Sequence, residues 1–180
     1  SRMAEPRTPS RAIVHDVLAG WKQSKLRMAL SIHRRGNLRA AKAIFEQLLS
    51  VDPNHLEALH HQAMIAIQVK DFTTALELAS RAINIDPCDA RIHYHHGLAL
   101  HHLNRLEESL ASYDRSIILD SSFMDARLNF ANVLRELGRI AEAITAYEKS
   151  LTINPCHVLT LINLSKAQHQ NGQIALAIST

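Results

Sequence analysis

The sequence predicts an all-α protein built as an α-solenoid of helix-turn-helix units. The main reason is a repeat period of about 34 residues: Pro53 and Pro87 lie one period apart, Pro155 follows two periods later, and Ser121 fills the phase between them. Composition agrees, because 47% of the 180 residues are hydrophobic while only 5 are glycine and 5 are proline. Both observations favour stacked helix pairs over a single large core.

The units share one boundary pattern, an apolar residue followed by Asp or Asn and then by Pro or Ser, as in Val51-Asp52-Pro53. Counting back from each boundary predicts four full units and one partial unit: 22–55, 56–89, 90–123, 124–157 and 158–180. Residues 1–21 precede them. There we expect a disordered lead over residues 1–9, then a short helix that Ser10 caps and Gly20 ends.

Small residues recur in two phases of the unit, where two helices crossing at about 8–10 Å leave no room for larger side chains. The eighth position holds Ala29, Ala63, Gly97, Ala131 and Ser165, and the twentieth holds Ala41, Ala75, Ser109, Ala143 and Ala177. Larger residues at the twenty-fourth position, Phe45, Tyr113 and Tyr147, are predicted to fill the core. Gly36, Gly138 and Gly172 share a phase that predicts a left-handed turn between the two helices of a unit.

This combination resembles the tetratricopeptide repeat (TPR) family, whose unit is a helix-turn-helix of about this length. The resemblance covers residues 22–180 and implies a right-handed superhelix that serves as a protein- or peptide-binding scaffold. It also implies that the first helix of each unit lines a concave groove. The groove residues that it assigns here are His60, His61, Met64, Arg91, Tyr94, His95, His102, Asn129, Asn132, Asn163 and Lys166.

One row of this predicted groove contains His61, His95, Asn129 and Asn163 at intervals of one period. The row resembles the asparagine ladder in the TPR superhelix of O-linked N-acetylglucosamine transferases, which grips the backbone of an extended peptide. An amide suits that task because it carries both a donor and an acceptor. The resemblance leaves an alternative open: the chain is the N-terminal, substrate-recruiting domain of a protein glycosyltransferase whose catalytic domain lies outside it.

No catalytic motif is present: the sequence has neither a glycine-rich phosphate loop nor a recognisable nucleophile, so this chain is not expected to be an enzyme. His93 and His96 have a spacing that suits a metal, but no carboxylate or cysteine in the same turn completes a ligand set, so no metal or other cofactor is expected. Cys88 and Cys156 occupy the same phase two repeats apart, which is well beyond the ~7 Å limit for a disulfide, so they are predicted to be free thiols. Without a Cys-x-x-Cys pair, neither is expected to have a catalytic or metal-binding role.

Charge and hydropathy limit the kinds of partner and the location that the sequence predicts. Residues 1–42 carry ten basic and two acidic residues, which favours a solvated end more than a nucleic-acid site, because few aromatics outside the core are left to stack on bases. The whole concave face of the predicted first helices holds seven of the 12 histidines, which points to a protein or extended peptide of acidic character. They are His33, His60, His61, His95, His101, His102 and His169. No apolar run suits a membrane span or a signal peptide, so a cytoplasmic location is expected. The partial last unit predicts a homodimer through the C-terminal units.

Overall fold

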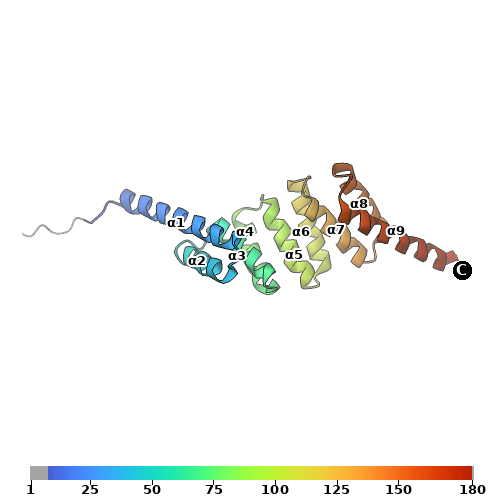
Figure 1. Cartoon of the computed structure of the whole chain (residues 1–180), viewed down its shortest axis with the longest axis horizontal. Coiled ribbons are helices and arrows are strands. Elements are labelled where there is room, and N and C mark those ends of the chain that lie inside the picture. Colours follow the sequence, from blue (N-terminus) through green and yellow to red (C-terminus); the bar gives the residue numbers. More distant parts are fainter. Residues whose placement is uncertain (1–7, 180) are drawn as a thin grey trace, which may run out of the picture. The chain divides into compact units, whose positions relative to one another are not determined.

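The computed structural model describes residues 8–179, and these form nine α-helices and no strand (Figure 1). The helices are α1 (Arg11–Arg34), α2 (Leu38–Val51), α3 (Leu56–Gln68), α4 (Phe72–Ile85), α5 (Ala90–His102), α6 (Leu106–Leu119), α7 (Met124–Glu136), α8 (Ile140–Ile153) and α9 (Val158–Ser179). None of them has the length and apolarity that a bilayer crossing requires. Of the lead expected over residues 1–9, residues 1–7 lie outside the described residues.

The chain divides into two compact units, unit 1 (Ser1–His61) and unit 2 (Gln62–Thr180). Unit 1 contains the hairpin of α1 and α2 together with the start of α3. In unit 2 each helix from α4 to α9 packs on the next one along the chain. The predicted all-α solenoid is therefore confirmed.

The turn within each helix pair follows the predicted period. Backbone φ is positive at Gly36, Lys70, Asn104 and Gly138, each one period after the last. At Gly36 the amide donates to His33 O, and the amide of Asn37 reaches back to Ile32 O, so two otherwise orphan helix carbonyls are satisfied. The same bonds recur at the other three turns. Lys70 and Asn104 thus adopt the left-handed conformation that the sequence predicted from glycines in this phase.

The turn between successive pairs explains the repeated Asp or Asn. After α4, Asp86 Oδ1 accepts a hydrogen bond from the Cys88 amide at 2.9 Å, and Asn154 does the same for Cys156 after α8 at 3.2 Å. Such an Asx turn supplies a backbone turn from a side chain. Both cysteines are exposed free thiols, as predicted.

The core consists of the small and large residues that the period predicted. Ala29, Ala41 and Ala131 have no exposed surface, and the rings of Phe45, Tyr113 and Tyr147 are likewise fully buried. Gly97 lies where α5 crosses α6, and a Cβ atom built on it would meet Tyr113 Cδ1 and Cε1 at 2.8 Å. That distance is too short for any side chain, which explains glycine at this position.

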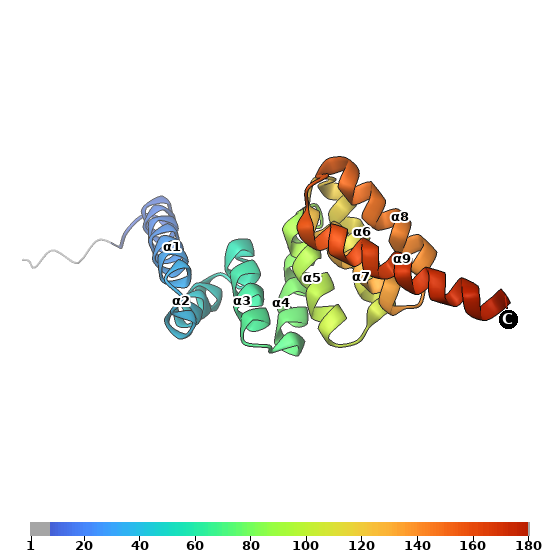
Figure 2. The ribbon, with the colours of Figure 1, turned by 45° about the vertical axis from the view of Figure 1, so that its right-hand side comes forward.

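Two expectations about helix ends were wrong. Gly20 does not end a short helix, because α1 runs unbroken from its Ser10 cap to Arg34. Gly172 does not form an inner turn either, since α9 continues through it to Ser179. A glycine weakens a helix by only about 1 kcal/mol, so it ends one only where the chain can turn back and pack. After Gly172 the described residues contain no returning helix, and the end of α9 extends beyond α7 and α8 (Figure 2).

Candidate peptide-binding site

Hydrogen bonds link the first helices of consecutive repeats in unit 2, where most of the predicted groove residues lie. Asn129 on α7 donates from Nδ2 to Tyr94 Oη on α5 in a long hydrogen bond of 3.5 Å. Asn163 on α9 donates from Nδ2 to Asn132 Oδ1 on α7 at 3.1 Å. The structure therefore brings four of the predicted residues together in two pairs, each spanning neighbouring first helices.

Tyr94 is a half-buried anchor for the first pair. Its ring packs against Phe123 with centroids 4.8 Å apart and against His95 at 5.2 Å. Burial, reinforced by the negative charge of Asp125, raises the pKa of Tyr94 to about 12. The phenol is consequently neutral at physiological pH and can accept the Asn129 hydrogen bond while keeping a proton to donate.

Asn132 is the centre of the second pair. Its Oδ1 accepts from Asn163 and also from the hydroxyl of the buried Tyr147 at 2.5 Å. The repeat period predicts Tyr147 as a core residue only, so its hydrogen bond to Asn132 was not expected. The feature of the sequence that could have predicted this contact is the Tyr147 hydroxyl, which Phe45 lacks at the same position of the first repeat.

The two ladder amides keep part of their hydrogen-bonding capacity. Among the described residues, the only recorded hydrogen bond of the Asn129 side chain goes to Tyr94 and that of the Asn163 side chain goes to Asn132, both through Nδ2. An amide offers two donor hydrogens and an acceptor oxygen. Each side chain is thus held through one N–H, and no further hydrogen bond of its Oδ1 or second N–H is formed within residues 8–179.

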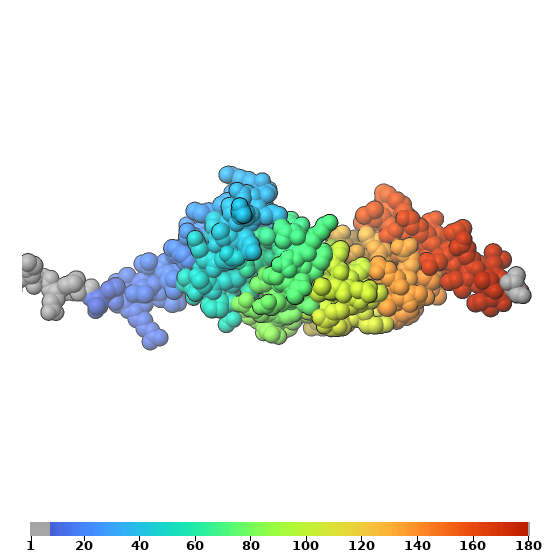
Figure 3. Space-filling view, turned by 90° about the horizontal axis from the view of Figure 1, so that it is seen from below, coloured from blue at the N-terminus to red at the C-terminus, as the bar shows by residue number. Residues whose placement is uncertain are grey.

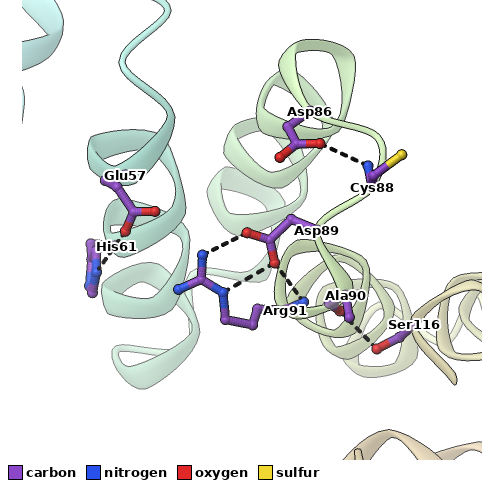
Figure 4. Close-up of polar contacts among 8 residues, drawn as sticks. All are labelled: Glu57, His61, Asp86, Cys88, Asp89, Ala90, Arg91 and Ser116. Carbon is purple, nitrogen blue, oxygen red and sulfur yellow. Dashed lines mark hydrogen bonds and ion pairs between the residues drawn. The ribbon is translucent and has the colours of Figure 1, made fainter. Parts of the chain in front are cut away.

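Cationic side chains near the predicted groove are paired within the chain. The Arg91 guanidinium lies against the Asp89 carboxylate with contacts of 2.6 and 3.1 Å (Figure 4). His101 Nε2 lies 3.0 Å from both carboxylate oxygens of Glu136. Lys166 on α9 is exposed. The surface is therefore less cationic than a count of its basic residues implies.

The histidines of the predicted groove take several different environments. His60 is only 3% exposed, so it presents little surface to a ligand. His102 stacks on Phe72 with ring centroids 4.2 Å apart, and burial, followed by the neighbouring His101, lowers its pKa. Acidification consequently charges His102 less readily than an ordinary histidine. Met64 is half-buried on the part of α3 that belongs to unit 2.

His93 and His96, the pair with metal-like spacing, make structural contacts. His93 Nε2 lies 2.8 Å from the carbonyl oxygen of Pro87, and His96 Nδ1 lies 2.8 Å from the hydroxyl of Ser112. Burial lowers the pKa of His96, and His93 lowers it further. A neutral imidazole suits a hydrogen bond to a hydroxyl, so this pair helps to position α5 against its neighbours.

Comparisons with known proteins agree with the repeat architecture. Models of the tetratricopeptide repeat match residues 26–90, 63–122 and 125–156. No curated protein matches the sequence. The matched models describe repeats, so the matched part of the chain is a protein-interaction scaffold.

Solved structures with the same fold include a MamA protein, 21% identical, with a TM-score of 0.79 over 88% of this chain and 86% of that one. MamA from Desulfovibrio magneticus RS-1, residues 41 to the end, is 19% identical with a TM-score of 0.71 over 76% and 77% of the two chains. YrrB, described as a TPR protein with an unusual peptide-binding site, is 18% identical with a TM-score of 0.73 over 82% and 76%. At 18–21% identity, the similarity to these structures shows a shared fold and nothing more.

Proposed function

Because the chain belongs to the tetratricopeptide repeat family, we propose that it is a scaffold whose unit 2 binds the backbone of an extended peptide through Asn129 and Asn163. The observation that carries the proposal is the hydrogen bonding of these two side-chain amides. Each is fixed through one N–H and keeps an acceptor and a donor for a ligand. The peptide-binding site named for YrrB, a protein of the same fold, supports this use of the surface.

The ligand is selected by its extended backbone more than by its charge. Arg91 and His101 already contact carboxylates of the chain, so they contribute little attraction for an acidic peptide. A pair of amides can bind peptide N–H and C=O groups whatever the side chains are. We therefore propose an uncharged or mixed-sequence segment in place of the acidic one that the histidines suggested. The matches named above give no support to the glycosyltransferase alternative.

Replacing both ladder amides should weaken peptide binding without unfolding the chain. Each lost hydrogen bond costs about 0.5–1.5 kcal/mol, so Asn129→Ala with Asn163→Ala should lower affinity by roughly 5- to 150-fold. The probe is the strongest binder from an array of random extended peptides, followed by fluorescence anisotropy.

Asn171→Ala provides the matched control for this test, because Asn171 is an exposed amide on the same helix as Asn163. Its affinity should equal that of the unmodified chain. If the double variant also binds as the unmodified chain does, with unchanged circular dichroism, the two amides do not contact the peptide and the proposal fails.

We further propose that α9 mediates self-association. Its apolar side chains are unusually exposed, with Ile174 at 43% and Ile178 at 81%, and its end stands clear of the remaining helices of unit 2 in Figure 3. Burying an isoleucine is worth about 1.5–3 kcal/mol. A second copy of α9 would bury the same apolar face on both chains, as a two-fold interface does.

Ile174→Glu with Ile178→Glu should raise the dimer dissociation constant by about ten-fold or more, because each change removes buried apolar area. Light scattering across a concentration series measures it. Gln168→Glu with Ser179→Glu adds the same charge to exposed polar positions on another face of α9 and should leave the constant unchanged. A chain that is monomeric at the highest concentration would exclude the dimer.

A further inference from the structure

We propose that Glu57, His60 and His61, at the start of α3, bind a zinc ion together with His33 from α1. All four residues belong to unit 1. The ligand atoms of Glu57, His60 and His61 all lie within 4.8 Å of one another, and no other group of three such side chains within residues 8–179 does so. No metal was expected from the sequence, in which only the histidine spacing around His93 suggested one.

The α-helix itself brings the first three ligands together. Residues three and four apart lie on the same helix face, which places Glu57 beside His60 and His61. The Glu57 carboxylate already lies 3.6 Å from His61 Nε2 (Figure 4). Ligand atoms at about 2.0–2.2 Å from a tetrahedral zinc ion are roughly 3.4 Å from one another. Small side-chain rotations therefore convert this cluster into three zinc ligands.

His33 supplies the fourth ligand from the neighbouring helix. Its ring centroid lies 5.7 Å from that of His61, and the rings of His60 and His61 are 5.5 Å apart. Two imidazoles bound to one tetrahedral ion have centroids about 5 Å apart, given the bond lengths to zinc. Both separations match this value to within about 1 Å. The ligand nitrogens of His33 lie outside the group within 4.8 Å, so the His33 imidazole has to rotate toward the ion to complete the set.

The surroundings hold the ligands in place. The fully buried ring of Phe45 stacks on His61 at 5.5 Å with an angle of 6° between the planes, which restricts rotation of the imidazole. His60 is 3% exposed, so water competes weakly for the ion. Three imidazoles and one carboxylate suit zinc, whereas Mg²⁺ and Ca²⁺ prefer sets of oxygen ligands.

Calorimetric titration of the full chain with zinc chloride tests the site, after removal of any affinity tag and with magnesium chloride as the comparison ion. We expect one zinc ion per chain and no binding of magnesium at the same concentration. His61→Phe keeps a ring stacked on Phe45 and removes the ligand nitrogens. It should lower zinc affinity by about 100-fold, because it removes one of the four ligands that together supply the binding free energy.

His102→Phe is the matched control, since His102 stacks on Phe72 in the same way, with an angle of 7° between the planes. This variant loses a histidine outside the proposed site and should bind zinc as the unmodified chain does. Glu57→Gln and His33→Phe should each weaken binding by at least about ten-fold. Circular dichroism confirms that every variant is folded.

Equal zinc affinity in the His61→Phe and His102→Phe variants would overturn the site, as would several weak ions per chain in place of one. The absorption of cobalt bound in place of zinc reports geometry, and the visible bands of a tetrahedral ion should disappear in His61→Phe. Peptide binding through Asn129 and Asn163 is measured separately, so either proposal can fail alone.

Discussion

Gly97→Leu is expected to lower the free energy of unfolding of unit 2 by about 3 kcal/mol, the upper end of the usual cost of overpacking a core. A Cβ atom at this position would already lie 2.8 Å from two carbons of the Tyr113 ring and 3.3 Å from Ser112 Cβ. Tyr113 is fully buried, so its ring cannot move out into solvent and its neighbours have to repack. Urea unfolding followed by circular dichroism measures the change.

Gly20→Ala is the control for this prediction, because nothing lies within 4 Å of a Cβ atom added there. Alanine favours a helix interior over glycine by up to about 1 kcal/mol, so this variant should be as stable as the unmodified chain or more stable. A Gly97→Leu variant that unfolds at the same urea concentration as the unmodified chain would show that α5 and α6 do not cross as closely as described.

Tyr147→Ala should destabilise unit 2 by about 3–5 kcal/mol, since it removes a fully buried aromatic ring and leaves a cavity. The ring packs among the core residues of α7, α8 and α9, including Leu134, Ile140 and Ala167. Its hydroxyl also donates to Asn132 Oδ1. Thermal and urea unfolding both report the loss.

Tyr147→Phe separates the ring from the hydroxyl. It should cost only about 0.5–1.5 kcal/mol, because the ring remains and Asn132 Oδ1 still accepts from Asn163. If Tyr147→Phe proved as damaging as Tyr147→Ala, the hydrogen bond to Asn132 and not ring packing would dominate at this position.

Regular spacing made most of the fold predictable. The left-handed turns recur once in each of the four full repeats, and Lys70 and Asn104 adopt the conformation predicted from the glycines in this phase. Helix ends at Gly20 and Gly172 were not predictable from the residue type alone, because a glycine leaves the choice to tertiary packing. In α1 the helix continues, and in α9 no described helix returns to pack.

The candidate sites were predictable only in part. The phase of Asn129 and Asn163 follows from the period, but their hydrogen bonds to Tyr94 and Asn132 depend on side-chain directions across 31 to 35 residues of sequence. The cluster around His61 was visible as Glu57, His60 and His61 on one short stretch of the chain. Its significance depends on His33, whose proximity only the packing of α1 reveals.

The exposed thiols of Cys88 and Cys156 give unit 2 a built-in pair of reporter positions. Both follow the same Asx turn, and they lie two repeats apart in the sequence. Thiol-reactive fluorophores or spin labels attached there require no engineered cysteine and no removal of other thiols, because the sequence contains only these two. A change in the distance between the two labels would show directly whether the array of repeats lengthens or shortens when a peptide binds.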